Sequence, residues 1–208
     1  LASYYQDFPK YRLPSQFLMV LSVQAPVLMM AALYDREVTG QLSLAMMALA
    51  LPVSLVGGAV SRAYYAEIAS IGKTDIAKIK RITISTQAKL FAMALPISFV
   101  FMTLAHPLFV FLFRKEWMVA ATYAAILAPF ILLQFTSSPL VQVINILGNQ
   151  VVFLLINMIR MIGLIFIYHF SLEKFITPKD FVLIISAFLF LFYFCVSVFI
   201  FKILGSPR

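Results

Sequence analysis

Charge is scarce in this sequence. Only 12% of the 208 residues are charged and 63% are hydrophobic, whereas a typical soluble domain carries about 25% charged residues. The composition therefore excludes an ordinary soluble protein. The apolar runs are about twenty residues long, which is the length of a helical span, and they are too uniformly apolar for the strands of a barrel. We expect an all-α integral membrane protein whose helices pair their backbone groups internally.

Cysteine and histidine are also scarce. The single cysteine, Cys195, lies within an apolar run, so the sequence offers no disulfide pair and no cysteine-rich metal site. His106 and His169 have no carboxylate or cysteine at ligand spacing, and His106 precedes a proline, which is typical of a helix end. We therefore expect no metal, no cofactor and no catalytic constellation, and hence a protein that is not an enzyme.

Acidic residues are absent from the interiors of the apolar runs. All eight lie at span ends or in loops: Asp7, Asp35, Glu37, Glu67, Asp75, Glu116, Glu173 and Asp180. A proton or sodium site in a membrane usually needs a buried carboxylate. The sequence supplies none, unless Glu67 turns inward from the end of its helix.

Six apolar runs predict six transmembrane helices. We expect them at residues 14–33, 41–66, 90–105, 117–147, 151–170 and 181–203, with a basic loop over 67–89. In that loop Ile76, Ile79 and Ile82 recur at intervals of three and form one apolar stripe. The stripe fits a short helix lying on an anionic membrane surface, and a plain solvated connector fits the same stretch.

Interior prolines are confined to the first four predicted helices. They are Pro26, Pro52, Pro96, Pro129 and Pro139. Proline frees a backbone carbonyl and kinks a helix, and bent helices are usual in transporters. The run over 117–147 is longer than one span requires, so its two prolines predict a kink or a break near Thr136-Ser137-Ser138.

Polar side chains follow one face of the stretch from Gln134 to Arg160. Gln134, Ser138, Gln142 and Asn145 lie four, four and three residues apart, and Asn157 and Arg160 lie three apart on the next run. An arginine at mid-bilayer costs about 2.5–3.5 kcal/mol, so we expect Arg160 to face a polar interior. These six side chains are the candidate cavity residues. They are also suited to a purely structural role as contacts between helices.

The distribution of lysine and arginine predicts the orientation. One side of the predicted membrane carries ten of them and the other carries five. By the positive-inside rule the richer side is cytoplasmic, which places both ends of the chain there. Lys10, Arg12 and Trp117 are the expected interface anchors. The net charge of +8 therefore reflects topology and contact with anionic lipid, and it does not indicate nucleic-acid binding.

Five stretches of the sequence form recognisable motifs: Asp7-Phe8-Pro9-Lys10-Tyr11 with Pro14-Ser15, Leu51–Gly57 with Ala63-Tyr64-Tyr65, Phe113–Trp117, Ile126–Pro129, and Ser137–Leu140 continuing to Gln150. Together they cover about residues 5–160 and resemble the second half of bacterial polysaccharide flippases of the O-antigen and capsule type, which share a superfamily with multidrug extrusion transporters. One departure is that Arg114 and Lys115 replace a glycine and an acid of the family's turn before Trp117.

The resemblance implies one six-helix half of a twelve-helix or longer transporter in the bacterial inner membrane. Such a protein moves a polyprenyl-pyrophosphate-linked oligosaccharide to the outer leaflet by alternating access, and its partner would be an N-terminal half of the same chain. Because the sequence has no initiator methionine or signal peptide, we expect it to be part of a longer protein. Two alternatives stay open: a small-molecule exporter of the same superfamily, and a membrane polymerase or ligase of the same polysaccharides.

Overall fold

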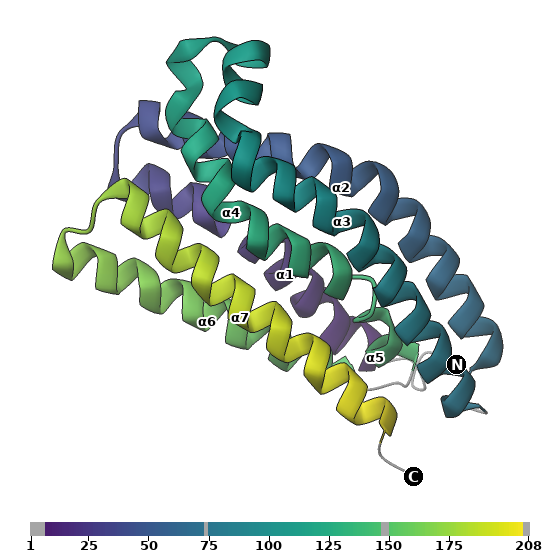
Figure 1. The fold of residues 1–208 in the computed structure, drawn as a ribbon. Helices are drawn as coiled ribbons and strands as arrows, with labels where there is room; N and C mark the ends of the chain where they lie inside the picture. Colours follow the sequence, from purple (N-terminus) through teal and green to yellow (C-terminus); the bar gives the residue numbers. More distant parts are fainter. Residues whose placement is uncertain (1–6, 73–74, 147–149, 206–208) are drawn as a thin grey trace.

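The computed structural model describes residues 7–72, 75–146 and 150–205. Over these residues the chain is helical and contains no strand. The elements are α1 (Asp7–Leu33), α2 (Arg36–Ile71), α3 (Ile76–Phe113), the 3₁₀ turn η1 (Lys115–Trp117), α4 (Met118–Ser137), α5 (Gln142–Ile146), α6 (Gln150–Lys174) and α7 (Pro178–Gly205). The long helices form an up-and-down bundle in which α1 begins and α7 ends at the same end (Figure 1).

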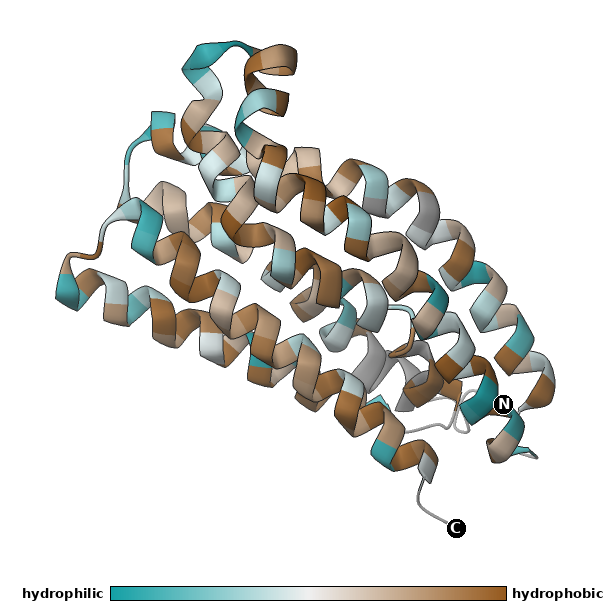
Figure 2. Ribbon diagram, viewed as in Figure 1, coloured by the Kyte–Doolittle hydropathy of each residue, from teal (hydrophilic) through white to brown (hydrophobic). Residues whose placement is uncertain are grey.

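The lengths and compositions of the helices are those of a multi-pass membrane protein. Five helical stretches are long and apolar enough to cross a bilayer, and a sixth is added if the two arms of α2 count as one span. Figure 2 shows hydrophobic residues along the bodies of the helices and hydrophilic ones gathered mainly towards their ends. The expected all-helical architecture, with apolar helices long enough to span a membrane, is confirmed.

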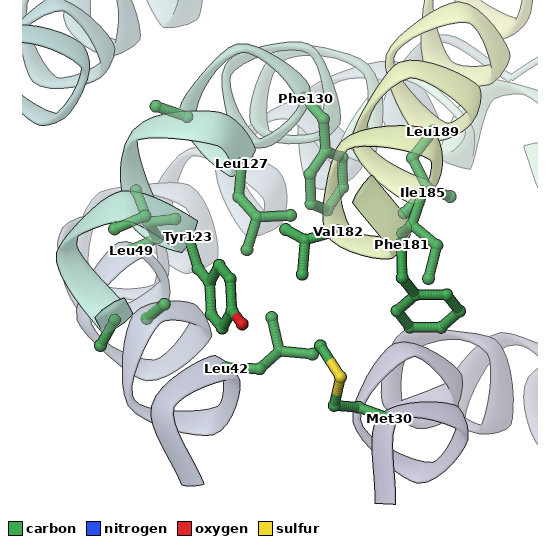
Figure 3. Close-up of a cluster of buried hydrophobic side chains, with 14 of the residues drawn as sticks. Met30, Leu42, Leu49, Tyr123, Leu127, Phe130, Phe181, Val182, Ile185 and Leu189 are labelled. Atoms are coloured by element: carbon green, nitrogen blue, oxygen red, sulfur yellow. The ribbon is translucent and has the colours of Figure 1, made fainter. Parts of the chain in front are cut away.

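Helix α4 is the centre of the bundle because its first half is built from small residues. It packs against α2, α3 and α7, and Ala120, Ala121, Ala124 and Ala128 are all buried in it. Small side chains let neighbouring backbones approach closely, which favours helix association in lipid. Larger side chains on the same helix, such as Leu127 and Phe130, meet Leu42 of α2 and Val182 of α7 in the main apolar core (Figure 3).

The segment 67–89, expected as a loop, is helical over most of its length. Helix α2 continues to Ile71, and α3 begins at Ile76 after the N-cap Asp75, whose carboxylate accepts the Lys78 amide proton at 2.8 Å. Ile79 is fully buried in a core cluster with Ile68 and Ile200. The isoleucine stripe therefore packs against α2 and α7, whereas we expected either a helix on a membrane surface or a solvated connector.

Other boundaries also differ from the expected ones. The predicted helix over 90–105 extends through Pro107 to Phe113, because Ala105 and Phe109 continue a buried stripe along α3. The predicted helix over 117–147 is divided: α4 ends at Ser137, just before Pro139, and a short α5 follows. Helices α1, α6 and α7 each run a few residues beyond the expected 14–33, 151–170 and 181–203.

Helix α2 bends by 51° between its arms Arg36–Pro52 and Gly57–Ile71. Pro52 lies at the bend, where it removes one backbone donor. Gly57 lets α4 approach closely, since a Cβ there would lie 2.8 Å from the Phe135 ring. The three remaining interior prolines that we expected to act as kinks, Pro26, Pro96 and Pro129, lie inside helices assigned without a break.

Two polar side chains, the buried Gln41 and the half-buried Tyr34, tie the helix connections together at the end of the bundle opposite the C-terminus. The Gln41 side chain, which is 6% exposed, accepts the Ala120 amide proton and donates to the Glu116 carbonyl, both at 2.9 Å. It thereby satisfies a backbone donor in the first turn of α4. Tyr34, just beyond α1, donates to the Ile176 carbonyl at 2.6 Å, and burial raises the pKa of this phenol, so it stays protonated.

Gln41→Ala should destabilise the bundle by about 1–3 kcal/mol, because it leaves the buried Ala120 amide proton without an acceptor and removes the donor to the Glu116 carbonyl. The measurement is the thermal unfolding of the purified protein in detergent. Gln41→Glu is the comparison variant: it keeps an acceptor for Ala120 but replaces the donor to Glu116 by a carboxylate oxygen and adds a charge, so it should also be destabilised. Equal stability of Gln41→Ala and the parent would contradict the assigned role.

Gly163 of α6 lies where α6 and the Phe188 ring of α7 approach closely, since a Cβ there would lie 2.2 Å from Cζ of Phe188. Gly163→Ala should force this ring to rotate and lower stability by about 1–3 kcal/mol. Gly40→Ala on α2 is the control, because a Cβ there meets nothing within 4 Å and alanine is the better helix former. Adding Phe188→Leu to Gly163→Ala should restore part of the loss. A loss that is equal at both glycines would overturn the packing argument.

Candidate functional site

A buried arginine lies near the middle of α6. Arg160 is the eleventh residue of that 25-residue helix and is 5% exposed. Its Nη1 donates to the Tyr193 hydroxyl at 2.7 Å, and its Nη2 donates to the Met19 carbonyl and to Asn157 Oδ1, each at 3.2 Å. Because all three acceptors are neutral, they hold the guanidinium in place without cancelling its charge.

The remaining donor of this guanidinium has no acceptor among the described residues. Nε of Arg160 is buried and makes no hydrogen bond there. The Phe192 ring lies with its centroid 6.0 Å from Arg160 Cζ, which adds a weak cation–π attraction. A buried donor without an acceptor is costly, so this group favours the approach of an additional acceptor such as an anion or a water molecule.

Tyr193 of α7 joins Arg160 to α4. Its hydroxyl also accepts a proton from Gln134 Nε2 at 3.2 Å, and its ring stacks on Phe130 with centroids 6.3 Å apart. Asn157 is held in turn by its own helix, where Nδ2 donates to the Phe153 carbonyl at 2.8 Å. The polar cluster of Arg160, Tyr193, Gln134 and Asn157 therefore comes from α6, α7 and α4, and it reaches α1 through Met19.

Two clefts share this cluster as a wall. The first, of about 420 Å³, is bordered by α1, α4, α6 and α7, and the second, of about 460 Å³, is bordered by α1, α2, α4 and α7. Both are lined by Gln134, Ser138, Arg160 and Tyr193. Their volumes fall within the range of small-molecule sites.

The two clefts differ in their polar lining. The first adds the amides of Gln16, Gln24 and Asn157, and the second adds Ser22, Ser54 and Ser61. Ser22 and Ser54 donate their hydroxyl protons to the Met19 and Leu51 carbonyls on their own helices, so their oxygens remain as acceptors. Amides and hydroxyls of this kind can hydrogen-bond the hydroxyls of a sugar.

The structure brings four of the six predicted cavity residues together. Gln134, Ser138, Asn157 and Arg160 line the first cleft, and Asn157 is the one of the four that the second cleft lacks. The side chains of Gln142 and Asn145 lie outside the described residues, as do those of the expected anchors Lys10 and Arg12. Trp117, the third anchor, lies in η1 and packs against the main core.

Sequence reasoning missed the contribution of α7. Ser186, Tyr193 and Ser197 are seven and four residues apart, so they share one helix face, and all three are buried. Ser186 donates to the Ile126 carbonyl at 2.7 Å, and Ser197 lies 2.7 Å from the Ser137 hydroxyl. The spacing was visible within the phenylalanine-rich run. Gln16 and Gln24, eight residues apart on α1, gave a similar signal.

The arrangement is suited to binding an anion and does not suggest a metal site. Every described acid lies within a few residues of a helix end, so none stands beside Arg160 on α6. Among the described residues, no group of three histidine, cysteine or carboxylate side chains is placed to hold a metal ion. What the clefts offer is one positive charge flanked by amides and hydroxyls.

Tyr193→Phe should destabilise the bundle by about 1.5–3 kcal/mol, because the lost hydroxyl accepts from a buried charged donor and from Gln134. Thermal unfolding in detergent measures this effect. Tyr168→Phe on α6 is the control, since Tyr168 is only partly buried and lies outside the cluster. The same small change at both tyrosines would contradict the role given to Tyr193.

Comparison with known proteins places the chain in a family. No curated protein and no solved structure matches it. Residues 2–122, more than half of the chain, match the family described as "Polysaccharide biosynthesis protein". The match covers α1, α2, α3 and the start of α4, and of these α1 and α2 line the second cleft. The chain is therefore a helical membrane protein that belongs to the polysaccharide biosynthesis protein family.

Proposed function

We propose that the chain is one half of a polysaccharide flippase. Its cargo would be an oligosaccharide linked to a polyprenyl pyrophosphate, moved from the cytoplasmic to the outer leaflet by alternating access. In this proposal the protein is a transporter and not an enzyme. It resides in the bacterial inner membrane with both ends of the segment cytoplasmic, and a second six-helix half is its partner.

The observation that carries the proposal is the uncompensated charge of Arg160 at the shared wall of the two clefts. A guanidinium held by neutral groups attracts an anion, and its planar array of donors suits phosphate oxygens. The low local dielectric strengthens that attraction relative to water. A cationic drug would meet electrostatic repulsion at the same place.

The polar lining supports a sugar-containing cargo. Gln16, Gln24 and Gln134 line the first cleft beside Asn157, and an amide offers both donors and an acceptor to sugar hydroxyls. The apolar residues between them, such as Val20 and Val23, suit the hydrocarbon of a lipid carrier. The family match supports a role in polysaccharide biosynthesis. The flipping step is our inference from the cleft.

Arg160→Ala should reduce translocation at least tenfold while leaving membrane insertion intact, because it removes the positive charge from both clefts. The assay measures how much lipid-linked oligosaccharide in spheroplasts is accessible to a lectin or enzyme that cannot cross the membrane. Arg160→Lys keeps the charge without the planar fork and should show an intermediate rate. Arg36→Ala, at an exposed site at the start of α2, is the matched control.

The outcomes separate the alternatives. Accumulation of inaccessible intermediate in the Arg160→Ala strain supports flipping, and parental outer-leaflet levels reject the cavity role of Arg160. Parental levels with altered tolerance to small toxic compounds would favour a small-molecule exporter. Parental levels with unpolymerised sugar outside would favour a polymerase or ligase.

A further inference from the structure

An open groove of about 700 Å³ lies between α3 and α7, away from the two clefts around Arg160. Its walls are Lys80, Ile84, Gln87, Ala88, Phe91 and Ala92 of α3, and Phe201 of α7. None of these residues borders either of those clefts. The groove therefore needs an explanation of its own.

The groove is charged at one end and mainly apolar along its length, where Gln87 is the one polar lining residue and donates its amide proton to Ser197 of α7 at 3.2 Å. Lys80, Ile84, Ala88 and Ala92 follow one another at four-residue steps, so they form a single row along α3. The alanines make a shallow floor, and Phe91 and Phe201 contribute aromatic surface. From Lys80 to Ala92 the row rises about 18 Å at 1.5 Å per residue, close to the depth of one leaflet, which is half of the roughly 30 Å hydrocarbon core.

Lys80 is held at the mouth of the groove. It is only partly exposed, and its Nζ lies 3.6 Å from the position that a Cβ would occupy on Gly205, the last residue of α7.

Other basic side chains lie at the same end of the two helices: Lys78 and Arg81 on α3 and Lys202 in the last turn of α7, all exposed. The nearby acid Asp75 is the N-cap of α3 and accepts the Lys78 amide proton.

We propose that this groove binds one anionic glycerophospholipid from the leaflet at the basic end of the bundle. The phosphate would meet Lys80, and one acyl chain would lie along Ile84, Ala88 and Ala92 against the two phenylalanines. Charge complementarity selects an anionic headgroup, and the match between groove length and leaflet depth selects an acyl chain of ordinary length. The site does not depend on the proposed translocation.

The experiment is native mass spectrometry of the delipidated full-length protein, titrated with phosphatidylglycerol or with phosphatidylcholine of the same acyl chains. The parent should retain one phosphatidylglycerol more tightly than the rest. Lys80→Gln should weaken that binding about fivefold, which corresponds to about 1 kcal/mol for one basic residue at an anionic lipid. Ala88→Phe, which fills the floor of the groove, should remove the tight site.

Two variants serve as controls. Lys89→Gln removes an exposed lysine of the same helix that does not line the groove, and it should leave the tight site unchanged. Lys80→Arg keeps the positive charge and should retain binding, which would show that the lipid requires the charge at this position and not lysine in particular. The proposal is overturned if Lys80→Gln and Lys89→Gln bind alike, if the two lipids are retained equally, or if a polyprenyl diphosphate displaces phosphatidylglycerol from the groove at equal concentration.

Discussion

A charge inside a membrane bundle must be satisfied by the protein itself, and Arg160 imposes this constraint on the fold. Hydrocarbon offers no hydrogen bonds, so the guanidinium draws its acceptors from α1, α6 and α7. Tyr193, the shortest of these contacts, also accepts from Gln134 of α4. Through these contacts Arg160 links four helices. The small residues of α4 favour close packing in lipid, and the polar contacts add specific pairings between particular helix positions.

The sequence predicted the features that depend on periodicity and backbone chemistry. Apolar runs indicated membrane helices, Pro139 indicated the interruption after Ser137, and the three-residue spacing placed Asn157 and Arg160 on one face. The helix boundaries were harder to predict, because they depend on what lies opposite. The isoleucine stripe of residues 76–82 suited a lipid surface equally well, and only the positions of Ile68 and Ile200 show that it packs against protein.

The partners of the polar groups could not be predicted, for a related reason. A helical period identifies a face but not the neighbour that this face meets. Tyr193 shares a polar face with Ser186 and Ser197, and that spacing does not identify Arg160 as its partner. Gln41 likewise looks like any residue near a helix start, yet it bonds the backbone 79 positions away at Ala120. Such contacts leave little trace in the sequence pattern, although they determine much of the tertiary arrangement.

A buried charge can be stabilised by an opposite charge, but that partner also cancels its attraction for a ligand. The acceptors around Arg160 stabilise its guanidinium without an opposite charge. A carboxylate partner would stabilise the guanidinium and also neutralise it. The Tyr193 hydroxyl, the Asn157 amide and the Met19 carbonyl restrain the geometry of the guanidinium and do not neutralise its positive charge. Because Nε remains without a described acceptor and the same wall borders both clefts, an anion reaching either cleft meets an oriented cation. The charge therefore stays uncancelled at the wall of both clefts while the same contacts hold the helices together.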